Sequence, residues 1–131
     1  MPILTIYLDK ATNLKDDDII GQSDPYIKFS LEQNNWGRDK GYGDMKSTTK
    51  SNELNPVYDE SFSFNIPSLS NMELSVKVMD DDIVLDDKIG KCKIKLEKLV
   101  LSETPLPIKE KVYNRIFGKD SYVHLKLSYT E

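Results

Sequence analysis

Aspartate residues crowd into two short stretches of the chain, and their chemistry is the first question that the sequence raises. The stretch VMDDDIVLDDKIG, residues 78–90, places five aspartates within eight positions, around the apolar triplet 83–85. An earlier stretch, residues 16–24, holds four more. Like charges this close repel, so a folded chain keeps them only where something offsets the repulsion. The nine residues are Asp16, Asp17, Asp18, Asp24, Asp80, Asp81, Asp82, Asp86 and Asp87.

These aspartates account for much of the acidity of the 131-residue chain, whose net charge is −4. Outside them, 13 acidic residues face 18 basic ones, so a mildly basic body carries two acidic tips. This distribution favours a cation at the tips and an anionic partner for the rest of the surface. Nucleic acid is not favoured as that partner, because the basic residues are scattered and the acidic tips would repel phosphate.

Apolar and polar residues alternate with a period of two along much of the chain, and this predicts about eight short strands. Both acidic stretches directly follow such a strand. Residues 97–110 are expected to form at most a helical turn before Pro105 and Pro107. Many short strands with one buried and one wet face predict an all-β fold, an eight-stranded antiparallel β-sandwich. The clear strands include residues 4–8, 27–31, 58–66, 74–78, 92–96 and 123–129, with weaker candidates at 45–51 and 112–117.

The glycine-rich stretch EQNNWGRDKGYGDMK, residues 32–46, lacks this alternation and is predicted to be a loop. Its Trp36 is expected to cover the end of the sandwich opposite the acidic loops. The length of the chain suits a single domain over residues 1–131. There is no apolar run of membrane-spanning length and no secretory signal pattern, and Cys92 is the only cysteine. A reducing, cytoplasmic location is therefore expected.

Loops at the same end of a sandwich converge, so the carboxylates of the two stretches would surround a common space. The first loop would supply Asp18 and Asp24, and the second Asp80, Asp82 and Asp87. Hard oxygen ligands in a flexible cage, without His or Cys, suit Ca²⁺ best. Mg²⁺ demands stricter octahedral geometry. The plain alternative is that both stretches are solvated charged loops without a ligand.

Two other motifs match part of the second acidic stretch. An EF-hand that starts at Asp80 would have Val84 and Lys91 where oxygen ligands belong, so that motif fails. DDDIV also fits the D-x-D-x-V pattern of a metal-dependent phosphatase, with Asp80 as nucleophile and Asp82 beside it. That fold requires a parallel sheet with crossover helices, and the chain has no further Lys, His or Ser/Thr motif to complete a catalytic set. The sequence therefore favours a binding protein over an enzyme.

Three segments, in family order, resemble the C2 domains. They are GQSDPYIKF at 21–29, NELNPVYDESFSF at 52–64 and VMDDDIVLDDKIGKCKI at 78–94. A fourth, SYVHLKLSY at 121–129, resembles the closing strand of the family, so the likeness covers essentially the whole chain. The first strand runs directly into the first acidic loop, which resembles the second of the two circularly permuted topologies of the family.

The resemblance implies a sandwich that binds two or three Ca²⁺ between its loops and docks on phospholipid. Asp18 and Asp24 match the first-loop ligands, and Asp80 and Asp82 match the paired aspartates of the third loop. Asp87 matches the late aspartate of that loop. The third loop is one residue shorter than in protein kinase C and resembles that of the cytosolic phospholipase A group, so Asp86 is an alternative to Asp87. Further candidate ligands are Asp17, Asp81 and Asn52, the last of which matches a loop-two ligand of the phospholipase group.

The apolar residues of the two acidic loops are expected to enter the lipid interface, although they could instead pack on one another. They are Ile19, Ile20, Ile83, Val84 and Leu85. The nearest candidates for a lipid headgroup are Lys28, Lys46, Lys50 and Lys77. We therefore expect a monomer that Ca²⁺ recruits from the cytoplasm to an anionic or zwitterionic phospholipid membrane. The alternative within the family is a scaffold that uses Ca²⁺ for stability or for binding a protein partner.

Overall fold

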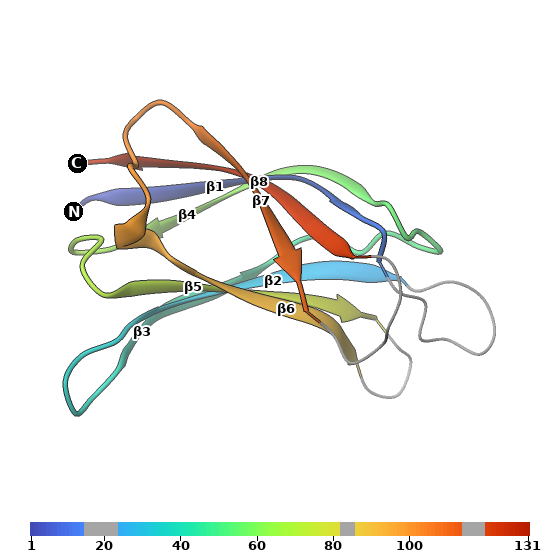
Figure 1. Ribbon diagram of the computed structural model, residues 1–131, viewed down its shortest axis with the longest axis horizontal. Coiled ribbons are helices and arrows are strands. Elements are labelled where there is room, and N and C mark those ends of the chain that lie inside the picture. The colour runs from blue at the N-terminus through green and yellow to red at the C-terminus, as the bar shows by residue number, and fades with distance from the viewer. Residues whose placement is uncertain (15–23, 82–85, 114–119) are drawn as a thin grey trace.

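The computed structural model describes residues 1–14, 24–81, 86–113 and 120–131, apart from the side chain of Asp87. Eight strands and one short 3₁₀ turn make up this part of the chain (Figure 1). The bounds are β1 Ile3–Thr12, β2 Pro25–Gln33, β3 Lys40–Lys46, β4 Val57–Asn65, β5 Met72–Asp80, β6 Asp87–Lys95, η1 Leu96–Lys98, β7 Leu106–Val112 and β8 Ser121–Thr130.

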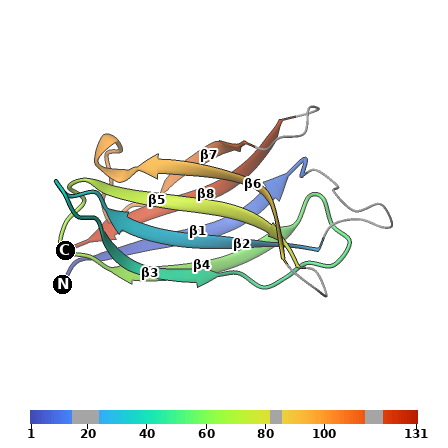
Figure 2. The ribbon, with the colours of Figure 1, turned by 90° about the horizontal axis from the view of Figure 1, so that it is seen from below.

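The strands form two four-stranded sheets, with the orders β4-β1-β8-β7 and β3-β2-β5-β6. Every pair of neighbouring strands is antiparallel. The two sheets lie face to face as layers, which Figure 2 shows along the length of the strands. The predicted eight-stranded antiparallel sandwich is confirmed. None of the described residues belongs to a helix that is long and apolar enough to cross a membrane.

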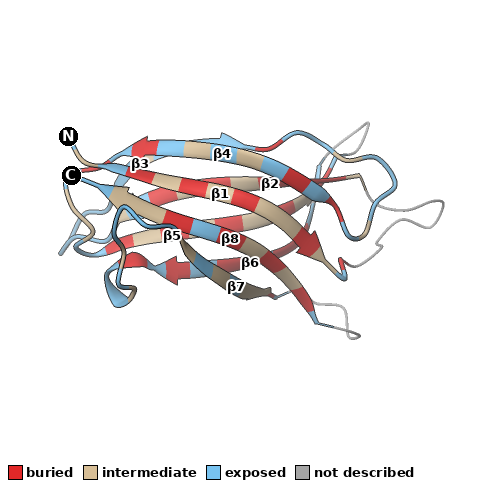
Figure 3. Ribbon diagram, turned by 90° about the horizontal axis from the view of Figure 1, so that it is seen from above, coloured by how far each residue is buried: buried red, intermediate tan, exposed pale blue. Residues whose placement is uncertain are grey.

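The core lies between the sheets and follows the period-two pattern of the sequence. On β1, Leu4, Ile6 and Leu8 are fully buried, whereas Thr5 and Tyr7 between them are half-buried on the outer face. The same alternation recurs along β5 and β8, as the colours of Figure 3 show. Each fully buried side chain of this size contributes about 1.5–3 kcal/mol. Cys92 is also buried in this core.

The glycine-rich stretch is not wholly a loop, because Lys40–Lys46 forms the edge strand β3. This strand has no buried residue and therefore carries no alternation. Its register comes from pairing with β2 and includes an irregularity between Leu31 and Glu32. Gly43 has a φ of +117°, and a Cβ built on it would lie 3.8 Å from the ring of Phe64. Pairing with a neighbouring strand thus overrides a local sequence that is typical of a loop.

Two other expectations about elements also change. The candidate strand at 45–51 is limited to the end of β3, since Ser47–Lys50 lie outside any strand. The expected turn is η1 at Leu96–Lys98, which ends before Pro105 and Pro107, but the residues that follow form β7, a strand that was not expected and that contains Pro107. Because β7 is an edge strand, a missing backbone N–H on its outer side costs no ladder hydrogen bond.

The hairpin between β2 and β3 lies at the end of the sandwich that also holds both chain termini (Figure 1). Trp36 sits in this hairpin and is 103% exposed, so it does not cover the end of the sandwich as the sequence suggested. The next residue, Gly37, has a φ of +77° and turns the chain. At the opposite end, β5 finishes and β2 and β6 begin, which brings the described parts of the acidic stretches together.

Candidate calcium-binding site

The two acidic stretches meet through Asp24 and Asp80. Asp24 directly precedes β2, and Asp80 ends β5, which pairs with β2 in a register that sets Pro25 opposite Asp80. The backbone N–H of Asp24 donates a 2.9 Å hydrogen bond to Oδ1 of Asp80. The N–H of Asp81 in turn donates to the carbonyl of Asp24, also at 2.9 Å. Two candidate ligands 56 positions apart are thereby fixed side by side.

Asp80 is the buried member of this pair, with only 2% of its surface exposed. Burying a carboxylate is costly unless hydrogen bonds or a cation compensate the charge. The hydrogen bond from Asp24 supplies part of that compensation. The second acidic segment lies beside it and adds like charge.

Residues of the segment after β3 donate hydrogen bonds to Asp24 and Asp81. Oδ1 of Asp24 accepts a 2.7 Å hydrogen bond from the backbone N–H of Asn52. Asn52 has a φ of +50°, which Asn tolerates better than most residues. Thr49 Oγ1 donates to Oδ2 of Asp81 at 3.3 Å. Asn52 therefore reaches the acidic end through its backbone, and Thr49 is a neighbour of the site that the sequence did not indicate.

Asp86 is oriented by Tyr26, a residue that sequence reasoning missed. The Tyr26 hydroxyl donates a 2.6 Å hydrogen bond to Oδ2 of Asp86. This bond to the carboxylate is the main cause that raises the pKa of Tyr26 to about 12, with burial adding to it. Asp87 begins β6 and pairs with Asp80 across the β5–β6 ladder. Asp86 and Asp87 thus both lie beside the Asp24–Asp80 pair.

Several candidates lie outside the described residues. They are Asp17, Asp18 and Asp82, the side chain of Asp87, and all five apolar tip residues, Ile19, Ile20, Ile83, Val84 and Leu85. Within the described ranges no three His, Cys, Asp or Glu side chains could hold a metal by themselves. The donors that are described, carboxylates from two separate segments, are of the oxygen type that Ca²⁺ prefers.

Three of the four candidate headgroup lysines form one row on the outward face of the second sheet. Lys28 on β2 pairs with Lys46 on β3 and with Lys77 on β5. The row continues to Lys91 on β6, which the sequence did not single out. Lys50 is separate from the row, and its ammonium lies 5.8 Å from the centre of the Tyr58 ring.

Gly90, which belongs to the third-loop motif, holds the two sheets close together. A Cβ at this position would collide with Cγ1 of Val112 and would come within 3.2 Å of the carbonyl oxygen of Tyr113. A pair of backbone hydrogen bonds joins the neighbouring Lys91 to Tyr113. Only glycine allows β6, which starts at the acidic end, to approach β7 this closely.

Comparisons with known proteins agree with this architecture. A family model described as the C2 domain matches residues 2–114. Human synaptotagmin-1 is 44% identical over 91 residues, which are 67% of this chain and 21% of the relative. Synaptotagmin-B of Diplobatis ommata is 45% identical over the same length, 67% of this chain and 20% of that protein. The chain thus spans about a fifth of the curated relatives that it matches.

Among solved structures, a C2 domain of a plant extended synaptotagmin 1 superimposes with a TM-score of 0.80 at 23% identity, covering 97% of this chain and 92% of that one. Human GIVD cytosolic phospholipase A2 matches with a TM-score of 0.79 at 22% identity, over 98% of this chain and 17% of the enzyme. At such identities the likeness concerns the fold. The family model, which covers most of the chain, and the synaptotagmin relatives show that the chain belongs to the C2 domain family.

Proposed function

We propose that this C2 domain is a Ca²⁺-dependent membrane-targeting module that binds two or three Ca²⁺ and then docks on anionic or zwitterionic phospholipid. The observation that carries the proposal is the contact between Asp24 and the buried Asp80, which joins the two acidic stretches at one end of the sandwich. A calcium-bound structure of extended synaptotagmin 2 shares the fold, with a TM-score of 0.68 at 22% identity. That likeness supports the choice of metal.

Each candidate ligand has a distinct part in the proposal. Asp18, Asp24, Asp80, Asp82 and Asp87 would hold the ions, and Tyr26 would keep Asp86 oriented toward them. Bound Ca²⁺ supplies positive charge that reverses the sign of an end which would otherwise repel anionic lipid. The tip residues Ile19, Ile20 and Ile83–Leu85 would then enter the interface. The protein would act as a cytoplasmic monomer that Ca²⁺ recruits to membranes.

A binding module is proposed rather than an enzyme. The phosphatase pattern around Asp80 and Asp82 belongs to a fold with a parallel sheet, whereas all strand pairs described here are antiparallel. Asp80 itself accepts a backbone hydrogen bond and is almost completely buried, which suits an ion ligand better than an attacking nucleophile.

Sedimentation with vesicles tests the proposed function. The purified chain is mixed with phosphatidylcholine vesicles, or with vesicles that also contain phosphatidylserine, in Ca²⁺ or in chelator. We expect the chain to pellet with vesicles only in Ca²⁺ and to return to the supernatant when chelator is added. Ca²⁺ binding without any association with vesicles would overturn the membrane function and favour the scaffold alternative. Equal pelleting in chelator would contradict the dependence on Ca²⁺.

The lysine row predicts which lipid is preferred. Replacing Lys28 and Lys77 with alanine should weaken Ca²⁺-dependent binding to phosphatidylserine vesicles on the order of tenfold, because each lysine near an anionic surface contributes about 1 kcal/mol. Binding to phosphatidylcholine vesicles should not change. The matched control removes Lys10 and Lys109 from the outward face of the other sheet. An equal loss in both double variants would show that net charge, rather than this row, determines the preference.

A further inference from the structure

The hairpin between β2 and β3 presents Trp36 to solvent at the end of the sandwich opposite the acidic stretches (Figures 1 and 2). The side chain is 103% exposed, whereas a tryptophan in a folded protein normally buries most of its large apolar surface. The core does not use this residue, and neither does the calcium-dependent docking proposed above. The exposed indole therefore calls for a separate explanation.

The backbone of the hairpin fixes the position of Trp36. The N–H of Arg38 donates a 3.2 Å hydrogen bond to the carbonyl of Asn35, which closes a β-turn. Trp36 and Gly37 are the two central residues of this turn. Gly37 has a φ of +77°, as the third position of a type II turn requires. Trp36 thus occupies the second position, at the outer corner of the turn.

The base of the hairpin is anchored to the body of the sandwich. Gln33 pairs with Lys40 at the end of the β2–β3 ladder. The N–H of Asn34 donates a 2.9 Å hydrogen bond to the carbonyl of Asn71, and Nε2 of Gln33 donates one of 3.0 Å to the carbonyl of Ser70. Both acceptors belong to the connection between β4 and β5. The indole is therefore carried by a supported turn rather than by a free loop.

Polar residues surround the indole at the tip of the hairpin. Asn34, Asn35, Arg38 and Asp39 are all exposed. A stable protein interface takes about 800 Å² from each partner and has an apolar core around its anchoring residues. One tryptophan among polar neighbours does not provide such a core. A lipid surface requires no complementary patch, and tryptophan is enriched at the headgroup level of membranes.

The charges of the tip favour a lipid surface that is anionic. The two cations, Arg38 and Lys40, outnumber the one anion, Asp39. The ammonium of Lys40 lies 5.3 Å from the centre of the Tyr42 ring, a contact that leaves its charge in place. Attraction to an anionic surface acts over a Debye length of about 8 Å and needs no direct hydrogen bond. Both cations therefore attract a membrane that the indole touches.

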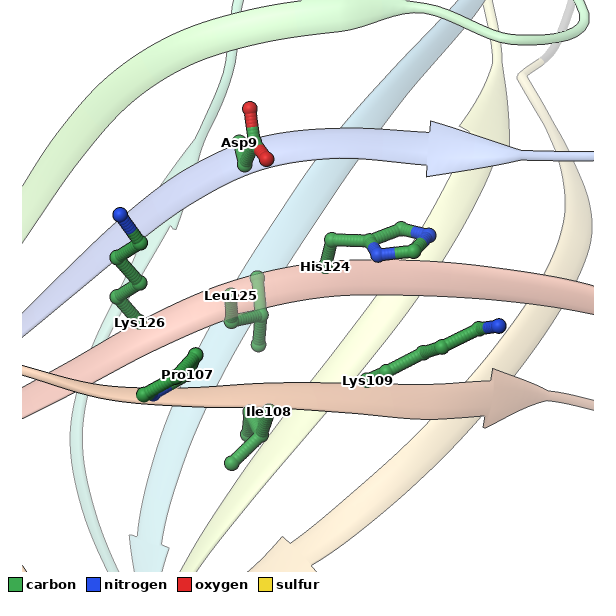
Figure 4. Close-up of a pocket in the computed structure, with 7 residues that line it drawn as sticks. All are labelled: Asp9, Pro107, Ile108, Lys109, His124, Leu125 and Lys126. Atoms are coloured by element: carbon green, nitrogen blue, oxygen red, sulfur yellow. The ribbon is translucent and has the colours of Figure 1, made fainter.

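A second copy of the chain is the other candidate partner for the indole. A hollow with a volume of about 220 Å³ lies on the outward face of the sheet β4-β1-β8-β7 (Figure 4). Asp9, Lys109, His124 and Lys126 border it. Seating an indole there would take charged side chains out of water, which is costly. The hollow is therefore a poor receptor for Trp36, and the observations favour lipid.

We propose that the Trp36 hairpin binds a second phospholipid membrane while the acidic end of the domain holds the first. This rests on the Ca²⁺-dependent docking proposed above, which turns the hairpin away from the first membrane. Strands such as β5, with nine residues, hold the two surfaces about 30 Å apart. A single indole binds lipid weakly, so the hairpin alone does not sediment with vesicles. Many domains on one vesicle present many hairpins, and together these cross-link vesicles.

Clustering of vesicles in Ca²⁺ tests the proposal. Vesicles of phosphatidylcholine and phosphatidylserine are coated with the domain and followed by dynamic light scattering. We expect W36A to reduce clustering on the order of tenfold, because the loss weakens every hairpin contact at once. W36A should still sediment with sucrose-loaded vesicles as the unaltered domain does. V100A, which truncates a 91% exposed apolar residue after η1 at the same end, should cluster vesicles normally.

Three results of this experiment would overturn the hairpin contact. They are an unaltered domain that sediments in Ca²⁺ without clustering vesicles, clustering that persists in W36A, and an equal loss in W36A and V100A. A domain that does not sediment in Ca²⁺ at all would overturn both this proposal and the calcium-dependent function. The two failures are therefore distinguishable.

The fluorescence of Trp36 reports on the hairpin alone, because the chain has a single tryptophan. In clusters, we expect its emission to shift to shorter wavelength and its quenching by acrylamide to fall. On vesicles too sparsely coated to cluster, the indole should stay as open to acrylamide as in chelator. Protection there would place the hairpin on the first membrane, and protection without lipid that rises with protein concentration would indicate a second copy. Either result would overturn the proposal, as would an indole that stays quenchable within clusters.

Discussion

Replacing Asp80 with asparagine is expected to lower the Ca²⁺ affinity of the domain on the order of 100-fold, since ligand charge sets the affinity of such sites. The side chain is 2% exposed and lies beside Asp24. Asparagine keeps its shape and an oxygen that can still accept the hydrogen bond from the N–H of Asp24, so the fold should survive. The substitution removes only the negative charge of the buried Asp80 carboxylate. Titration of Ca²⁺ against vesicle binding measures the shift.

The control for this variant is Asp39→Asn, which removes one charge from an exposed position between β2 and β3, at the other end of the sandwich. Its Ca²⁺ midpoint should equal that of the unaltered domain. Unfolding by heat in chelator checks that both variants fold. If D80N folds and has the same Ca²⁺ midpoint for vesicle binding as D39N, Asp80 is not a ligand.

Replacing Ile83 with aspartate is expected to weaken vesicle binding about 10- to 100-fold and to leave Ca²⁺ affinity nearly intact. The change removes an apolar insertion of about 1.5–3 kcal/mol and puts a charge where the loop should meet lipid. Sedimentation with vesicles at saturating Ca²⁺ measures the first effect. Calorimetry of Ca²⁺ binding without lipid measures the second.

Val100→Asp is the matched control, because Val100 is 91% exposed and follows η1, away from the acidic end. It introduces the same side chain and the same charge at a surface that should not contact lipid. The insertion hypothesis fails if I83D and V100D bind vesicles equally well. A loss of Ca²⁺ affinity in I83D would instead indicate that the tip residues pack together and support the ligands.

The buried strands were predictable because each has one face in the core. Phe64 and Ile66 alternate with polar neighbours, and in the structure both are buried. β3 was not predictable, since a solvent-exposed edge strand leaves no hydrophobic pattern and its glycines favour a loop locally. β7, which contains Pro107, was missed for a related reason, because the sequence does not say which strand will be an edge that tolerates proline.

The convergence of Asp24 and Asp80 followed from the strand pattern, because both residues lie where strands of one sheet begin or end. The contacts that orient the acidic residues could not be predicted from the strand pattern. Tyr26 donates a hydrogen bond to Asp86, 60 positions away, and Thr49 donates one to Asp81, 32 positions away. Single hydrogen bonds between distant residues produce no repeating pattern in the sequence. Likewise, the sequence indicated Asn52 only as a candidate ligand, and the hydrogen bond from its backbone N–H to Asp24 could not be predicted.

Isothermal calorimetry of Ca²⁺ added to the chelator-treated domain tests the central claim most directly, since it needs neither lipid nor a partner. Saturable heat is predicted for the unaltered domain, and it should be greatly reduced in D80N and unchanged in D39N. Absence of heat up to millimolar Ca²⁺, in a domain shown to be folded, would contradict the assignment of these aspartates as a calcium site.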